Sequence, residues 1–270
     1  MKLAWVTDIH LNFLESAERK RFYQDIVATD SNAVIITGDI AEAPTVSEMF
    51  EEMLRHIAKP IYFVLGNHDY YKSNVVNVRK TIAQLSQENA LINWLPEVGL
   101  VQLTQNTLLV GEDCWADGRL GNYADSRVIL NDSHMIQELI EARIVGKFQL
   151  LDAMQKLADT DAARLKKNLK LAIQQHSPKK IIVLVHVPPF RESCMHNGKI
   201  SNDDYLPFFS SKTTGDALLE TAKANPKIDF LVLCGHTHST SYYKPLDNLT
   251  VKAGASDYGK PVIQEIIELQ

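Results

Sequence analysis

Residues 61–69 read IYFVLGNHD, an apolar run followed at once by a glycine, an amide, an imidazole and a carboxylate. The run Ile61–Leu65 predicts a buried strand. The side chains of Asn67, His68 and Asp69 are not needed to end a strand, so the tetrapeptide fits either an ordinary turn or a functional site. Four other apolar runs of the chain end in residues of the same kinds, and this recurrence favours function.

Outward from this stretch, the first third of the chain alternates strands with helices. Apolar runs and helical spacing of apolar residues predict strands at 2–7, 33–37 and 61–65 and helices at 16–28, 45–57 and 74–88. This order is typical of an α/β layered domain. Because the strands are continuously apolar, we expect a sheet that is covered on both faces.

The remainder of the chain contains further strands and two long irregular stretches. Strands are expected at 101–103, 107–110, 181–185, 230–234, 241–244, 250–252 and 262–269. The irregular stretches cover 111–133 and 190–213, and loops of this length are uncommon unless they are functional or disordered. We find no internal repeat and no low-complexity linker, so the sequence predicts one domain over residues 1–270.

A long helical region separates the two irregular stretches. Residues 133–176 carry apolar side chains at helical spacing and predict two or three helical segments. Gly146 is expected to break the pattern, and Asp159 or Asp161 could cap a last helix.

Five of the predicted strands are followed within two residues by a potential metal ligand. The ligands at these strand ends are Asp8, His10, Asp39, Asn67, His186, His236 and His238. In open α/β sheets, functional sites gather beyond the carboxyl ends of the strands. Each residue alone also suits a turn, a cap or a buried histidine. Together they favour a single shared site.

The mixture of nitrogen and oxygen ligands indicates which ions such a site would hold. Structural zinc sites are four-coordinate and usually contain cysteine, and calcium sites contain almost only oxygen. Imidazoles and carboxylates in this number suit two transition ions, such as Mn²⁺, Fe, Zn²⁺ or Co²⁺. Two ions about 3.5–4 Å apart can stabilise both the attacking and the leaving oxygen of a displacement at phosphorus.

Composition narrows the function classes. The formal net charge of −5 argues against a dedicated nucleic-acid binder, which usually has a basic excess. No apolar run is long enough for a membrane span, and the first residues do not resemble a signal peptide, so a cytoplasmic location is expected. Three cysteines without paired spacing make disulfides unexpected.

The ordered set of strand-end motifs resembles the calcineurin-like metallophosphoesterase superfamily. The matching motifs are Asp8-x-His10, Gly38-Asp39, Gly66-Asn67-His68-Asp69, His186 after a strand, and Gly235-His236-Thr237-His238. The resemblance covers residues 1 to about 258. It implies an αββα fold, in which a two-sheet β-sandwich core is flanked by helices and carries a dinuclear metal centre. Residues 133–176 would be a helical insertion or cap.

The resemblance also implies a role for each motif residue. Asp8, His10 and His238 would hold one ion, Asn67, His186 and His236 would hold the other, and Asp39 would bridge the two. A metal-bound hydroxide would attack the phosphorus of a phosphomonoester or phosphodiester. His68 would protonate the leaving oxygen, a role that suits a histidine near neutral pH, and Asp69 could orient it.

The substrate is expected to be a small phosphoester or a phosphoprotein rather than nucleic acid. Specificity should lie in the loops, where the candidate substrate contacts are Tyr71, Arg119, Arg127, Arg191 and His196, together with Trp115 and Tyr123. Each of these also suits an ordinary surface or packing position. A nuclease of the same superfamily and a non-catalytic binding scaffold are the alternatives, although a scaffold would be expected to have lost ligands.

Overall fold

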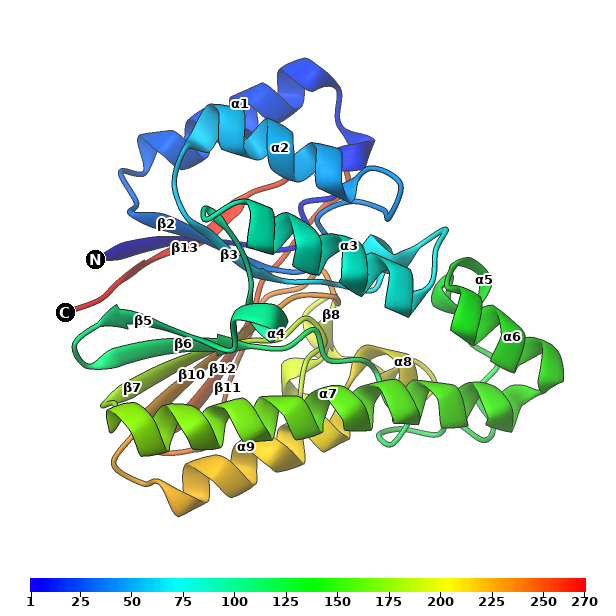
Figure 1. Ribbon diagram of the computed structural model, residues 1–270. Coiled ribbons are helices and arrows are strands. Elements are labelled where there is room, and N and C mark those ends of the chain that lie inside the picture. Colours follow the sequence, from blue (N-terminus) through cyan, green and yellow to red (C-terminus); the bar gives the residue numbers. More distant parts are fainter.

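The first of two main sheets holds both ends of the chain. The computed structural model describes residues 1–270. The strand order is β13-β1-β2-β3-β4, with β1 to β4 parallel and β13 antiparallel beside β1. The strands are β1 Lys2–Val6, β2 Ala33–Thr37, β3 Ile61–Val64, β4 Ile92–Trp94 and β13 Ile263–Glu268. The two termini therefore lie side by side at one end of this sheet (Figure 1).

The second sheet has six strands in the order β11-β12-β10-β7-β6-β5. Its four central strands are parallel, and β5 and β11 form antiparallel edges. The strands are β5 Leu100–Thr104, β6 Thr107–Gly111, β7 Lys180–Leu184, β10 Asp229–Cys234, β11 Ser241–Leu246 and β12 Leu249–Ala253. A separate hairpin consists of β8 Met195–His196 and β9 Lys199–Ile200.

Helices cover the outer face of each sheet (Figure 1). The helices are α1 Ser16–Ala28, α2 Val46–Ile57, α3 Val75–Glu88, α4 Leu95–Val98, α5 Asp132–Met135, α6 Gln137–Val145, α7 Lys147–His176, α8 Leu206–Phe209 and α9 Lys212–Ala224. The first three lie over the first sheet, and α7 and α9 lie over the second. The first half of α7 extends beyond the sheets together with α5 and α6, at the right of Figure 1.

The strands read as continuously apolar because both faces of each sheet are buried. In β1, Leu3 and Trp5 belong to the core between the two sheets. Ala4 and Val6 of the same strand belong to the core under the helices. Alternate residues of a strand point to opposite faces, so a strand in the middle of this four-layer arrangement needs apolar residues at every position.

The predicted α/β class and the two-sheet core are confirmed. The expected break at Gly146 is also confirmed, because it separates α6 from α7. The expectation that Asp159 or Asp161 caps a last helix is wrong, since α7 runs without interruption through both residues. Asp161 is buried inside this helix, where its carboxylate pairs with Arg79 at 2.6 Å. None of the helices is both long enough and apolar enough to cross a bilayer.

The irregular stretch 190–213 contains more structure than its sequence indicated. The hairpin β8–β9, a 3-10 helix at Arg191–Ser193 and the short helix α8 all lie within it. The sequence pattern also missed β4 and α4, which are only three and four residues long. Elements this short do not present a full period of apolar residues.

Candidate metal centre

The carboxyl ends of five strands, β1, β2, β3, β7 and β10, meet at one edge of the two sheets and bring the seven predicted ligands together. The backbone at this edge is strained. Asp8, His10, Asp39, His236 and His238 all have positive φ angles, between 40° and 70°. Residues other than glycine rarely adopt this conformation, and it concentrates at functional sites. The strain indicates that the fold holds these side chains in fixed positions.

Two glycines of the motifs allow the carboxylates to approach closely. A Cβ atom at Gly66 would lie 2.1 Å from Asp39 Oδ1, and one at Gly235 would lie 2.1 Å from Asp8 Oδ2. Any side chain at these two positions would displace a ligand carboxylate. The glycines at these two positions are therefore required by space.

One half of the site contains four ligands from the first sheet and the loop after β10. The potential ligand atoms of Asp8, His10, Asp39 and His238 all lie within 4.8 Å of one another. His10 Nε2 is 3.3 Å from His238 Nε2, and His238 Nε2 is 3.4 Å from Asp8 Oδ1. Asp8 is held in place because its carboxylate accepts hydrogen bonds from the Thr7 hydroxyl at 2.6 Å and from the His236 backbone N–H.

The other half of the site is organised around the side-chain oxygen of Asn67. His186 Nε2 lies 3.0 Å from Asn67 Oδ1, and His236 Nδ1 lies 2.9 Å from the same oxygen. The second ring nitrogen of each histidine faces a backbone carbonyl, that of Thr37 for His186 and that of Phe208 for His236. In the neutral rings those nitrogens therefore carry the proton, and the nitrogens that face Asn67 carry a lone pair.

Asp39 lies between the two halves. Its Oδ2 is 3.8 Å from His10 Nε2, and its Oδ1 is 3.4 Å from His186 Nε2. Burial raises the pKa of Asp39, but the surrounding histidines, His186 and His68 first, outweigh burial and hold the pKa well below its usual range. One ionised carboxylate thus presents one oxygen to each half of the site.

The donor set fits two cations. The Asn67 oxygen and the lone-pair nitrogens of His186 and His236 are all acceptors, and acceptors this close repel one another unless a cation or proton lies between them. In the other half, burial lowers the pKa of His10 to about 4, which keeps its imidazole neutral. Neutral imidazoles and an ionised carboxylate are the forms that bind transition ions.

The predicted general acid lies beside Asp39. His68 Nε2 is 3.9 Å from Asp39 Oδ2, and the His68 backbone N–H donates a hydrogen bond to Asp39 Oδ1 at 2.9 Å. The His68 ring stacks on Tyr71 with a centroid separation of 4.2 Å. The side chain is 14% exposed, so it borders the site and still reaches solvent.

Asp69 has different partners from those that the sequence suggested. Its carboxylate accepts hydrogen bonds from the backbone N–H groups of Ile40 and Ala41, both at 2.9 Å, and of Gly66 at 2.8 Å. No hydrogen bond joins it to the ring of His68. Asp69 therefore ties the loop after β2 to the loop after β3, and it can act on His68 only through the backbone.

Two carboxylates that the sequence did not single out position the Asn67 half of the site. Asp132 Oδ1 accepts hydrogen bonds from Asn67 Nδ2 at 2.7 Å and from the Tyr71 hydroxyl at 2.6 Å. Asp113 accepts from the Leu65 N–H at 2.8 Å through its side chain, and from the His186 N–H at 3.0 Å through its backbone carbonyl. Asp132 follows no apolar strand, so no signal of the kind used above could have found it. Asp113 follows the apolar strand β6 by two residues, so the strand-end signal could have pointed to it.

Asp113 also belongs to a buried acidic cluster with Glu112 and Asp161. Arg79 pairs with Asp113 at 3.3 Å and with Asp161 at 2.6 Å, and Arg164 pairs with Glu112 and Asp161. The cluster is therefore compensated by side-chain cations. It connects α3, α7 and the end of β6 behind the metal centre.

The predicted substrate contacts are dispersed. Tyr71 touches the centre through Asn67 and His68. Arg119 pairs with Asp117 and Asp159, Arg191 pairs with Asp203, and His196 is exposed in the β8–β9 hairpin. None of these three forms a hydrogen bond or ion pair with a predicted ligand. Arg127 borders a separate cavity, together with Trp115 and Tyr123.

Comparison with known proteins gave one family and a set of similar folds. The family model described as calcineurin-like phosphoesterase matches residues 1–240. No curated protein matches the chain significantly.

Three solved structures illustrate the likeness of the fold. A phosphopantetheinyl hydrolase from Mycobacterium tuberculosis is 14% identical with a TM-score of 0.68, over 96% of this chain and 90% of that one. A dimetal phosphatase from Danio rerio is 11% identical with a TM-score of 0.58, over 94% and 87%. A protein from Thermus thermophilus is 12% identical with a TM-score of 0.54, over 98% and 96%. At these identities the likeness concerns the fold alone.

Proposed function

Because the chain belongs to the calcineurin-like phosphoesterase family, we propose that it hydrolyses a phosphomonoester or phosphodiester at the centre built from the seven strand-end ligands. The observation that carries this proposal is the position of Asp39, which presents one carboxylate oxygen to each half of the ligand set. Asp8, His10 and His238 would hold one divalent ion, and Asn67, His186 and His236 would hold the other. Such ions supply positive charge to the phosphoryl oxygens and lower the pKa of a bound water.

The chain's own residues have three tasks in this reaction. Asp39 fixes the spacing of the two halves, and Asn67 completes the second half with a neutral oxygen. His68 is the proton donor, and Nε2 is the ring nitrogen that faces the centre. In the overall reaction, an oxygen from water forms a bond to phosphorus, the bond from phosphorus to the leaving oxygen breaks, and His68 gives that oxygen a proton. The proton that the water releases restores His68.

The test is hydrolysis of p-nitrophenyl phosphate and of bis(p-nitrophenyl) phosphate by protein that has been stripped with EDTA and reloaded with Mn²⁺. We expect metal-dependent turnover of at least one of the two. Inactivity on both, and on a panel of nucleotides, with the metals bound would overturn the proposal. Faster cleavage of single-stranded DNA or RNA than of either small ester would favour a nuclease instead.

A further inference from the structure

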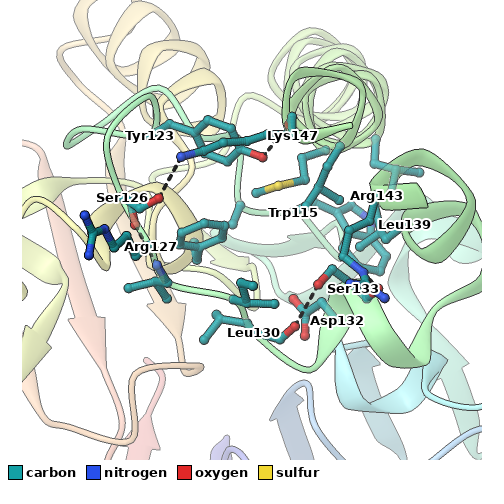
Figure 2. Close-up of a pocket in the computed structure, with 17 residues that line it drawn as sticks. Trp115, Tyr123, Ser126, Arg127, Leu130, Asp132, Ser133, Leu139, Arg143 and Lys147 are labelled. Carbon is teal, nitrogen blue, oxygen red and sulfur yellow. Dashed lines mark hydrogen bonds between the residues drawn. The ribbon is translucent and has the colours of Figure 1, made fainter. Parts of the chain in front are cut away.

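A large apolar cavity lies beside the candidate metal centre. It has a volume of about 370 Å³ and is enclosed by the segment 115–133, the helices α6 and α7 and the side chain of Phe208. Figure 2 shows its side chains arranged around an open middle, with Tyr123 and Lys147 on one side and Leu130 and Asp132 on the other. Eleven of its 17 lining residues are hydrophobic, which is typical of a site for an apolar ligand group.

Two lining residues connect the cavity directly to the centre. The Asp132 carboxylate holds the Asn67 amide at 2.7 Å, and the Phe208 carbonyl lies 3.0 Å from His236 Nε2. Both partners belong to the Asn67 half of the ligand set. A molecule whose phosphate lies at the metals therefore has an apolar cavity within reach of its remaining part.

The charges around the cavity indicate which kind of molecule would enter. Arg127, Arg143 and Lys147 line it, and none of them forms an ion pair. Arg143 donates to the Ser133 carbonyl, and Lys147 donates to backbone carbonyls of the same segment. Asp132 is the one carboxylate among the lining residues, and it accepts hydrogen bonds from Asn67 and Tyr71, so the three cations leave the lining with a positive balance. They favour an anionic ligand through local attraction.

We propose that this cavity binds the apolar group of the substrate, and that the substrate is an amphiphilic phosphoester whose phosphate carries an alkyl or acyl chain. This inference rests on the proposed function, since it assigns the substrate class of the same site. The alkyl or acyl chain of the substrate would lie in the cavity against α6 and α7 while the phosphate lies at the metals. Arg127, Arg143 and Lys147 would attract the anion from solution.

Turnover of n-butyl, n-hexyl and n-octyl phosphate below their micelle-forming concentrations tests the inference. Each buried methylene is worth about fourfold in binding. We therefore expect kcat/KM to rise roughly tenfold or more from the butyl to the octyl ester, even with incomplete burial of the chain. The same rate for all three esters, with p-nitrophenyl phosphate hydrolysed normally, would overturn the inference and leave the proposed function intact.

Two variants of helix α7 test where the alkyl chain of the ester binds. Leu157 lines the cavity, and Leu171 lies on the same helix outside it with 37% exposure. Leu157→Trp is expected to abolish the preference for octyl over butyl phosphate, measured as the ratio of the two kcat/KM values in the same variant. Leu171→Trp should retain the preference. Equal loss in both variants would contradict binding in the cavity.

Binding without turnover separates the two proposals. Calorimetric titration of metal-free protein in EDTA with n-butylphosphonate and n-octylphosphonate, whose C–P bond is not hydrolysed, should give tighter binding for the longer chain. Arg127 is exposed, so Arg127→Ala should fold normally and weaken octylphosphonate about two- to fivefold, the effect of one solvent-exposed charge. Equal affinities for the two phosphonates would overturn the inference. Chain-length-dependent binding by a protein that hydrolyses no phosphoester would overturn both proposals, because the occupant would then not be a substrate.

Discussion

The carboxylate of Asp132 accepts a hydrogen bond of 2.7 Å from the side-chain amide of Asn67. This contact fixes which end of the amide faces the candidate metal centre. With Nδ2 held by Asp132, the oxygen must point toward His186 and His236, where it lies 3.0 and 2.9 Å from their nitrogens. An aspartate on a short helix thus determines the orientation of a ligand on a loop 65 residues earlier.

Asp132→Ala should weaken the Asn67 half of the centre without removing a ligand. Loss of a partner that orients a ligand typically lowers metal affinity about 10- to 100-fold. Calorimetric titration with Mn²⁺ should show this loss for one of two ions. Asp125→Ala is the matched control, because Asp125 is exposed and bonds only with neighbouring Asn122. Unchanged affinity in Asp132→Ala would show that the Asn67 amide needs no external support.

Asp39→Asn should abolish turnover of p-nitrophenyl phosphate and release at least one ion. An amide cannot supply the charge and the two equivalent oxygens that a bridging carboxylate offers. Elemental analysis of the purified, reloaded variant measures the loss, with the fold checked by circular dichroism. Normal turnover in this variant would refute the bridging role.

His68→Ala should retain both ions and lose roughly 10²- to 10⁴-fold in kcat, the usual contribution of a general acid. The loss should be smaller for p-nitrophenyl phosphate than for an alkyl phosphate, because p-nitrophenolate leaves more readily without a proton. His176→Ala, at the exposed end of α7, is the control. A comparable loss for both substrates would argue that His68 acts on the phosphate rather than on the leaving oxygen.

Arg79→Met should destabilise the fold. Arg79 neutralises Asp113 and Asp161, both of which are buried, and its removal leaves those carboxylates uncompensated. Breaking a buried ion pair from one side typically costs about 3–5 kcal/mol of unfolding free energy, which urea denaturation can measure. Lys80→Met on the same helix is the control, and it should change the stability little because Lys80 forms no ion pair. A loss below about 1 kcal/mol would mean that the acidic cluster is stabilised by its other partners.

The sequence could predict the parts of the centre that follow apolar strands. Three of the ligands follow apolar runs within two residues, namely Asp8, Asp39 and His186. Each run predicts a buried strand, so the same stretch of sequence predicts both the strand and the position of the ligand at its end. The layered fold follows from the same runs, because both faces of each strand are buried.

The parts that the sequence could not predict depend on partners distant along the chain. In the sequence, Asp161 stands where a residue that caps a last helix is expected. In the folded chain it lies inside α7 and pairs with Arg79 of α3. The contact between Asp132 and Asn67 depends on how the loops pack. So does the position of the Phe208 carbonyl, which faces Nε2 of His236. Every residue has a backbone carbonyl, so the residue type at position 208 does not predict this contact.

Anomalous X-ray diffraction from crystals loaded with Mn²⁺ tests the central claim most directly. The account predicts two anomalous peaks about 3.5–4 Å apart, one beside each oxygen of Asp39. Asp8, His10 and His238 should surround the first peak, and Asn67, His186 and His236 the second. A single peak, or two peaks that Asp39 does not touch, would contradict it.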